Sequence, residues 1–154
     1  LRLDKSFVDL DLQDPYIFGQ ASLIQDGTDA TIICSGGILE EVLICTNKLS
    51  EEEGINCRLL SMHTVKPLDK KAILKAYEET KGIITVEENN IIGGLGSAVA
   101  EVLQSANVKK KYFKMIGIQD TYSSIVGDQK FLRKEYGISS EHIYREIKKV
   151  NLNI

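Results

Sequence analysis

The chain has 154 residues, of which 43% are hydrophobic and 27% charged, the composition of one ordinary globular domain with a sizeable core. Its formal net charge of −3 argues against a dedicated nucleic-acid binder, so the short basic runs at 109–111 and 148–149 are interpreted as solvated surface. No apolar run approaches the ~20 residues that span a bilayer, and no membrane partner is expected.

The first residues carry no signals of a folded element. Residues 1–14 alternate loosely between apolar and polar types and lack a helix cap, so we interpret them as a linker or arm from a preceding domain. The first residue is Leu1, and the chain is expected to begin inside a longer one. One domain is predicted over 15–154, and its first segment, 16–27, has strand-forming residues around Gly19 followed by a turn.

Alternating strands and helices fill the rest of the chain. Short, continuous apolar runs have the pattern of strands buried on both faces, and they lie at 30–34, 56–62, 82–88 and 112–118. The predicted helices are 38–54, 70–81, 93–106, 128–137 and 139–150. This order predicts a parallel sheet with helices on both faces, and any site is expected beyond the carboxyl ends of the strands.

Capping residues mark several of these boundaries. Asp69 and Asp128 are predicted N-caps, because a short carboxylate can accept from the first free N–H groups of a helix. Gly54 and Gly137 are predicted C-terminal stops. His142 lies in the last amphipathic helix and is interpreted as structural.

The three cysteines are widely spaced and odd in number, which does not fit a metal site. They are Cys34, Cys45 and Cys57. We interpret them as core residues in a reducing compartment, and the expected location is therefore cytoplasmic.

A glycine-rich loop follows the predicted strand 82–88. Gly94 and Gly96 match two positions of a dinucleotide fingerprint, but Val99 is too bulky for the third, and the acidic residue expected after the next strand is missing. We therefore interpret Gly93, Gly94 and Gly96 as residues that turn the chain sharply and let another protein surface come close.

A second such loop contains Gly36 and Gly37 after the strand 30–34. A helix N-terminus at this place can accept an anion, although no Lys or Arg stands nearby in the sequence. A nucleotide- or anion-binding regulatory module using these loops is therefore kept as an alternative function.

Polar residues at the strand ends form no assembled catalytic set. Glu87 and Glu88 are adjacent on a strand and point to opposite faces, so they cannot share a proton, and Glu87 is expected to cap or pair with backbone at the loop. His63 lies at the same edge and is a weaker candidate for acid–base chemistry. Lys66 and Pro67 turn the chain after the second predicted strand. No catalytic, cofactor-binding or metal-binding residue is assigned.

The order of the motifs resembles the C-terminal domain of transketolase-like thiamine diphosphate enzymes, over about 15–150. The shared motifs are K-P-L-D at 66–69, V-E-E at 86–88, G-G-x-G-S at 93–97 and G-I-Q-D at 117–120. Gln119 replaces the proline usual in the last motif, and Ile125 and Val126 stand where small or polar residues are expected. Within the family, the residues of these motifs are most similar to those of the transketolase and deoxyxylulose-phosphate synthase branches.

The resemblance implies a fold and a role. The fold would be a three-layer α/β/α sandwich with a five-stranded mixed sheet, in which 18–24 supplies an antiparallel strand beside the four parallel ones. Thiamine diphosphate and a divalent metal would bind the two other domains of the complete enzyme, in the same chain or in a separate subunit, and not this domain. The complete enzyme would be a homodimer or a heterotetramer.

The function implied is a structural, dimer-supporting domain of an enzyme that transfers a two-carbon ketol group between sugar phosphates, inactive alone. A subunit-docking domain of a 2-oxo-acid dehydrogenase β subunit is the alternative within the family. The candidate interface or strand-end residues are Gly36, Gly37, His63, Lys66, Pro67, Glu87, Glu88, Gly93, Gly94 and Gly96.

Overall fold

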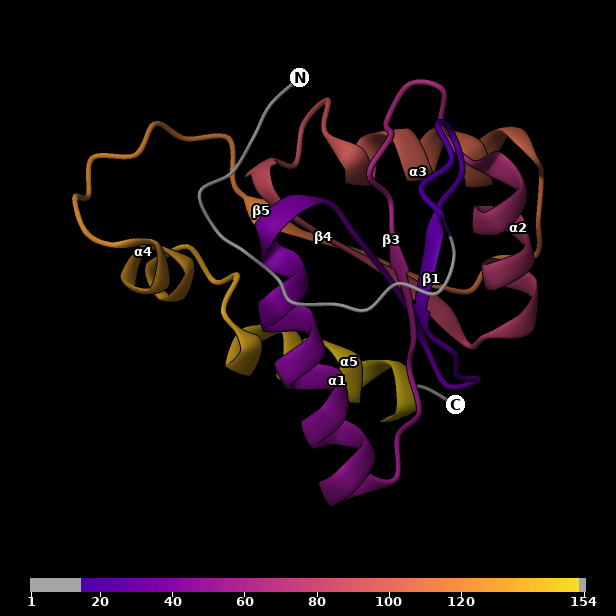
Figure 1. Ribbon diagram of the computed structural model, residues 1–154, viewed down its shortest axis with the longest axis horizontal. Coiled ribbons are helices and arrows are strands. Elements are labelled where there is room, and N and C mark those ends of the chain that lie inside the picture. The colour runs from indigo at the N-terminus through magenta and orange to yellow at the C-terminus, as the bar shows by residue number, and fades with distance from the viewer. Residues whose placement is uncertain (1–14, 153–154) are drawn as a thin grey trace.

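The computed structural model describes residues 15–152 and contains a five-stranded mixed sheet (Figure 1). The strands, in the spatial order β1-β3-β2-β4-β5, are β1 Ser22–Gln25, β3 Arg58–Ser61, β2 Thr31–Cys34, β4 Gly82–Asn90 and β5 Tyr112–Ile118. β1 pairs antiparallel with β3, and the other pairs are parallel. The antiparallel strand expected from the resemblance is confirmed. The arm predicted over 1–14 lies outside the described residues.

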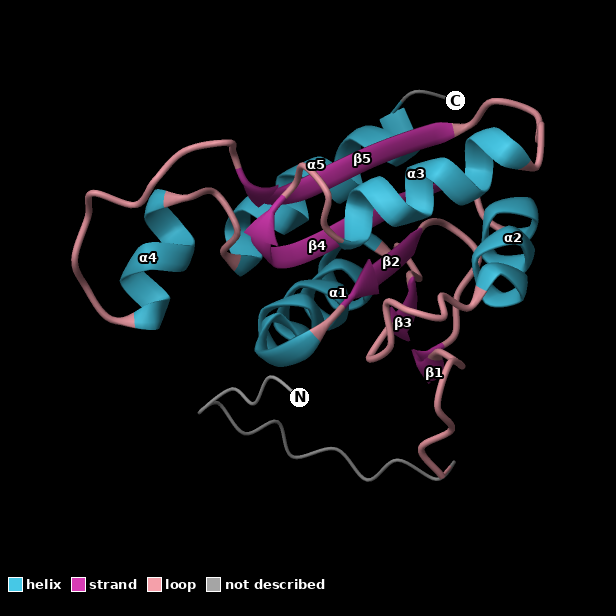
Figure 2. Ribbon diagram, turned by 90° about the horizontal axis from the view of Figure 1, so that it is seen from above, coloured by secondary structure: helices cyan, strands magenta, loops and turns pink. Residues whose placement is uncertain are grey.

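The helices form a layer on each face of the sheet (Figures 1 and 2). Their bounds are η1 Gly36–Ile38 (a 3₁₀ turn), α1 Leu39–Glu53, α2 Lys70–Glu79, α3 Leu95–Ser105, α4 Gln129–Glu135 and α5 Ser140–Leu152. α1 and α5 pack together on one face, and α2 and α3 on the other. Among the described residues, no helix combines the length and apolar character needed to cross a bilayer.

Alternation along the central strands divides the core in two. In β2, Ile32 packs toward α1 and α5, whereas Ile33 packs toward α2 and α3. Ile84 and Ile83 divide in the same way in β4. All four side chains are fully buried, and each contributes about 1.5–3 kcal/mol to folding. The apolar runs of the sequence therefore correspond to strands covered on both faces.

The predicted caps and stops are confirmed. Asp69 accepts a hydrogen bond from the N–H of Ala72, and Asp128 accepts one from Phe131, at 3.0 and 2.8 Å. Gly54 and Gly137 adopt left-handed backbone angles, with φ of 65° and 69°. The three cysteines are buried and unpaired, and burial raises the pKa of the Cys34 thiol to about 12.

Lys111 departs from the prediction of a solvated basic run. Its Nζ donates to the carbonyl oxygens of Tyr77, Glu78 and Thr80 at 2.6, 2.7 and 2.8 Å. Its backbone N–H also donates to the Tyr77 hydroxyl at 2.6 Å. The lysine thus caps the C-terminus of α2, where backbone carbonyls lack intrahelical partners. Lys110 is exposed, as expected.

Replacing Lys111 with Met should lower the free energy of unfolding by about 2 kcal/mol, because three charge-assisted hydrogen bonds to α2 are lost. Urea unfolding followed by circular dichroism measures this. Lys110→Met removes the same charge from an exposed position and should change stability by less than about 0.5 kcal/mol. Equal losses in the two variants would contradict the capping role.

Candidate functional site

The loops that follow the four parallel strands meet at one edge of the sheet (Figure 1). The predicted site residues lie on the ends of these strands, in the loops that follow them, or in the first turns of the next helical elements, as Gly96 does in α3. They do not gather into one cavity. Instead, β4 places its two glutamates on opposite sides of the sheet, and each organises a separate structure.

Glu87 binds the N-terminus of α3. Its Oε2 accepts from the N–H of Leu95 and its Oε1 accepts from the N–H of Gly96, both at 2.9 Å. The side chain is buried, with 3% of the residue exposed. The expected pairing of Glu87 with loop backbone is confirmed. Its carboxylate takes the place that a phosphate takes at the N-terminus of a nucleotide-binding helix, so the loop's N–H groups are already used.

The glycines of this loop differ in what surrounds them. A Cβ on Gly94 would collide with the Glu87 carboxylate, and a Cβ on Gly96 would lie 2.7 Å from Thr85 Oγ1. Both therefore permit close packing within the domain, which corrects the expectation that they make room for a neighbouring protein. Gly93 has a φ of 75° and faces open space, as does Gly36 in the loop after β2.

Glu88 points to the other face and binds Arg133 of α4. The Glu88 Oε1 accepts from Arg133 Nε at 2.7 Å and from Gln129 Nε2 at 3.1 Å. Arg133 Nη1 lies 3.6 Å from an oxygen of Glu41 in α1, and the other oxygen of Glu41 accepts from the N–H of Ser140 at 2.8 Å. The network joins β4, α1, α4 and α5. The opposite orientation of the two glutamates is confirmed.

Arg133 is a buried cation, with 4% of the residue exposed. Burial disfavours the charged form and is the largest single influence, but the hydrogen bond to Glu88 and the charges of Glu88, Glu41 and Glu40 together outweigh it and raise the pKa of the guanidinium. Arg133 is also the only buried residue of α4. Hence α4 is held on the domain mainly by charge pairing, where most helices use an apolar face. Sequence reasoning missed this residue, because an arginine in an amphipathic helix usually faces water.

The segment 119–128, here called the β5–α4 arm, lies between β5 and α4 and is exposed throughout (Figure 2). Tyr122 is 99% exposed and Val126 is 96% exposed. The arm is tied down at two points: Asn90 Nδ2 donates to Asp120 at 3.0 Å, and the Tyr136 hydroxyl donates to Ser123 at 2.6 Å. These two hydrogen bonds anchor the arm, while its apolar side chains face the solvent.

His63 lies at the same edge without forming an acid–base pair. Its ring stacks on Tyr16 with centroids 4.3 Å apart, and its Nδ1 is 3.2 Å from Thr64 Oγ1. Burial lowers the pKa of the imidazole, which is therefore neutral at pH 7. Its Nε2 is buried without a partner in the described part of the chain. Lys66 and Pro67 follow it in an exposed turn.

Comparison with known proteins identifies the family. The sequence model of the family described as "Transketolase, C-terminal domain" matches residues 19–143. The chain belongs to this family. A 6-deoxy-6-sulfo-D-fructose transketolase subunit of Clostridium sp. (strain MSTE9) is 35% identical over 133 residues, covering 86% of this chain and 40% of the relative. A 1-deoxy-D-xylulose-5-phosphate synthase of Heliobacterium modesticaldum is 38% identical over 130 residues, covering 82% of this chain and 19% of that protein.

A solved structure described as a split gene transketolase, inactive beta4 tetramer, has the same fold. It superposes with a TM-score of 0.80 at 27% identity, covering 96% of this chain and 46% of the other. The chain therefore spans about two fifths of the transketolase subunit and a fifth of the synthase. The three-layer transketolase C-terminal fold expected from the resemblance is confirmed.

In this transketolase C-terminal domain, the fit of Gly94 against Glu87 can be tested by a double-mutant cycle. Gly94→Ala should lower the free energy of unfolding by about 2 kcal/mol, because its Cβ collides with the Glu87 carboxylate and, less closely, with the Asn90 carbonyl oxygen. In a Glu87→Ala background the same change should cost at least about 1 kcal/mol less. Additive losses would show that the added methyl group meets a different surface. Chemical unfolding of the four proteins supplies the values.

Removing the Arg133 cation should release α4 and the β5–α4 arm. In Arg133→Met, amide exchange in 119–136 should accelerate roughly 100-fold, as expected if breaking the buried pairs costs about 3 kcal/mol. Exchange in β2 and β4 should remain slow. The control is Lys134→Met, which removes a neighbouring exposed cation. Unchanged exchange in Arg133→Met would show that apolar contacts hold α4.

Proposed function

We propose that the chain is the C-terminal structural domain of a transketolase-type enzyme, which transfers a two-carbon ketol group between sugar phosphates. The domain supports the assembly of that enzyme and contributes no catalytic residue. The observation that carries the proposal is the β5–α4 arm. Its apolar side chains are exposed, and it leads into α4, which the ion pair of Arg133 holds on the domain. Membership of the transketolase C-terminal family supplies the class of enzyme.

The arm has the properties of a surface made for a partner. Tyr122 and Val126 are almost fully exposed, and Phe131 of α4 is also exposed. These three apolar side chains are close together in the sequence, and exposed apolar patches on folded domains mark interaction sites, where aromatic residues dominate the binding energy. The ion pairs of Arg133 hold this surface in place before binding, which reduces the entropy lost on association. The partner we propose is a thiamine-binding domain of the same enzyme.

The residues present do not fit a thiamine diphosphate site. The N–H groups at the N-terminus of α3 are occupied by Glu87, and the described residues form no group of three His, Cys, Asp or Glu side chains able to hold a metal. In such enzymes the protein must hold the reactive carbon of the cofactor and exclude water. We assign cofactor and metal to the other domains, in the same chain or in a separate subunit.

The length of the chain supports the same assignment. It spans less than half of the relatives, one of which is named as a subunit. The solved split-gene relative is described as an inactive tetramer of beta chains. We propose that this chain is likewise inactive without the remaining domains, that the complete enzyme is a homodimer or heterotetramer, and that it is cytoplasmic.

The proposal is tested in the complete enzyme reconstituted with the missing domains. Replacing Tyr122 and Val126 together with Ser should weaken assembly at least about tenfold, because two exposed apolar anchors are lost. Ketol transfer should fall in parallel and recover at high protein concentration. Leu23→Ser, on β1 at the opposite edge of the sheet, is the matched control at another exposed apolar position. Analytical ultracentrifugation and a ketol-transfer assay give the two readouts.

The 154-residue chain alone provides the second arm of the experiment. Calorimetry with thiamine diphosphate and Mg²⁺ should show no binding, and the chain should not turn over a ketose phosphate. Binding by the isolated chain would overturn the assignment of the cofactor to other domains. Unimpaired assembly of the arm variant would overturn the role of the β5–α4 arm.

A further inference from the structure

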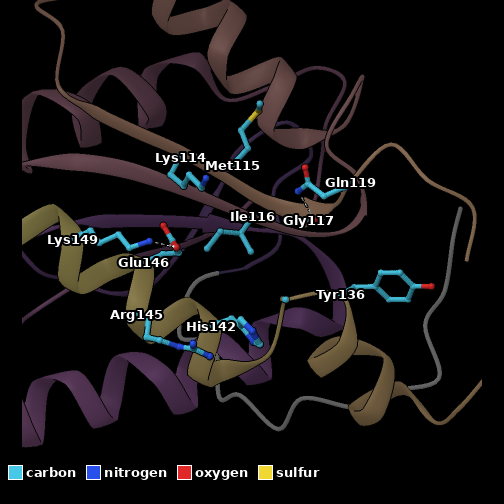
Figure 3. Close-up of a pocket in the computed structure, with 11 residues that line it drawn as sticks. Lys114, Met115, Ile116, Gly117, Gln119, Tyr136, His142, Arg145, Glu146 and Lys149 are labelled. Carbon is cyan, nitrogen blue, oxygen red and sulfur yellow. Dashed lines mark hydrogen bonds and ion pairs between the residues drawn. The ribbon is translucent and has the colours of Figure 1, made fainter. Parts of the chain in front are cut away.

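A pocket of about 330 Å³ lies between β5 and α5, and Gln119, just after the end of β5, also lines it (Figure 3). β5 is the last strand of the sheet, so its outer edge has no strand partner among the described residues. In a parallel ladder, alternate residues of an edge strand turn their backbone N–H and C=O groups outward. The pocket therefore lies beside a strand edge, where the carbonyl of Gly117 accepts from Gln119 Nε2 at 3.3 Å. Its volume suits a small metabolite.

The side chains that line this pocket are mainly positive, although the net charge of the chain is negative. The whole chain carries −3, yet the pocket is lined by Lys114, Arg145 and Lys149 against a single carboxylate, Glu146. Figure 3 shows Lys114 on β5 and the Lys149–Glu146 pair on α5, with Arg145 beside His142. The Lys149–Glu146 ion pair, with 2.5 Å between Nζ and Oε1, neutralises that carboxylate.

Two cations at the pocket have no carboxylate partner among the described residues. Lys114 makes no hydrogen bond or ion pair within them, and Arg145 donates only from Nε to the backbone carbonyl of Glu141 at 3.2 Å. The guanidinium of Arg145 keeps further N–H donors for an acceptor. The positive charge and the N–H donors of these two side chains match the charge and the oxygen acceptors of a phosphate group.

We propose that the β5–α5 pocket binds a small phosphate-bearing molecule. Lys114 and Arg145 contact the phosphate oxygens, and the remaining volume holds the group esterified to them. His142 lies at the wall, with its Nδ1 3.1 Å from Ser139 Oγ, so its second ring nitrogen is left for the ligand. This site is separate from both glycine loops, it touches the β5–α4 arm only at Gln119, and its occupation needs no thiamine cofactor.

The test is calorimetric titration of the full 154-residue chain with inorganic pyrophosphate at low ionic strength, without thiamine diphosphate. Saturable binding is expected, with chemical shifts in an NMR titration confined to β5 and α5. The double variant Lys114→Met with Arg145→Met should weaken binding at least about tenfold, because two charge-assisted contacts are lost. Sodium chloride at matched ionic strength is the control for general screening.

Matched charge removal distinguishes a site from a general electrostatic effect. Lys110→Met with Lys134→Met removes two exposed cations outside the pocket and should leave the affinity unchanged. Circular dichroism verifies that both double variants are folded. No saturation below about 10 mM pyrophosphate, or equal weakening in the two double variants, would overturn the proposal.

Discussion

The buried carboxylate of Glu87 at the N-terminus of α3 is the interaction on which this edge of the domain depends. It satisfies two helix N–H groups and places a negative charge at the positive end of the helix dipole. A glycine at 94 is required because any Cβ would occupy the space of that carboxylate. The loop therefore has the appearance of a phosphate-binding turn while its anion is supplied by the protein itself.

The next residue of β4, Glu88, holds α4 on the domain. Because side chains alternate along β4, Glu88 reaches the face opposite to Glu87 and pairs with the buried cation of Arg133. That pair, with Glu41, fixes a helix whose other residues are not buried. The end of β4 therefore fixes the start of α3 on one face of the sheet and holds α4, next to the exposed arm, on the other. This division favours a structural role, since the titratable groups are engaged in holding the fold.

Much of the fold followed from local patterns in the sequence. The apolar runs located the parallel strands, and Asp69, Asp128 and Gly54 marked helix ends, because these signals act over a few residues. The pairing of Glu87 with loop backbone was also predictable, since only the strand-to-helix order was needed. Strand-forming residues around Gly19 indicated a strand near β1, but its antiparallel pairing came only from the family resemblance, because a four-residue edge strand carries little signal about its partner. The sequence pattern suggests that Gly94 and Gly96 leave space for a neighbouring protein, whereas Glu87 and Thr85 of the same domain fill that space.

By itself, the sequence determined the alternation of strands and helices, their caps and the orientation of the two glutamates, since each depends on neighbours within about one turn or one strand. Only the tertiary structure decided the roles of Lys111 and Arg133. Their partners lie 34 and 45 residues away in the chain, at Tyr77 and Glu88. The same holds for the β5–α5 pocket, whose cations come from two distant segments. From the sequence alone, a charged residue is predicted to be solvated surface. Its distant partner is set by the tertiary fold, and no local sequence pattern indicates that contact.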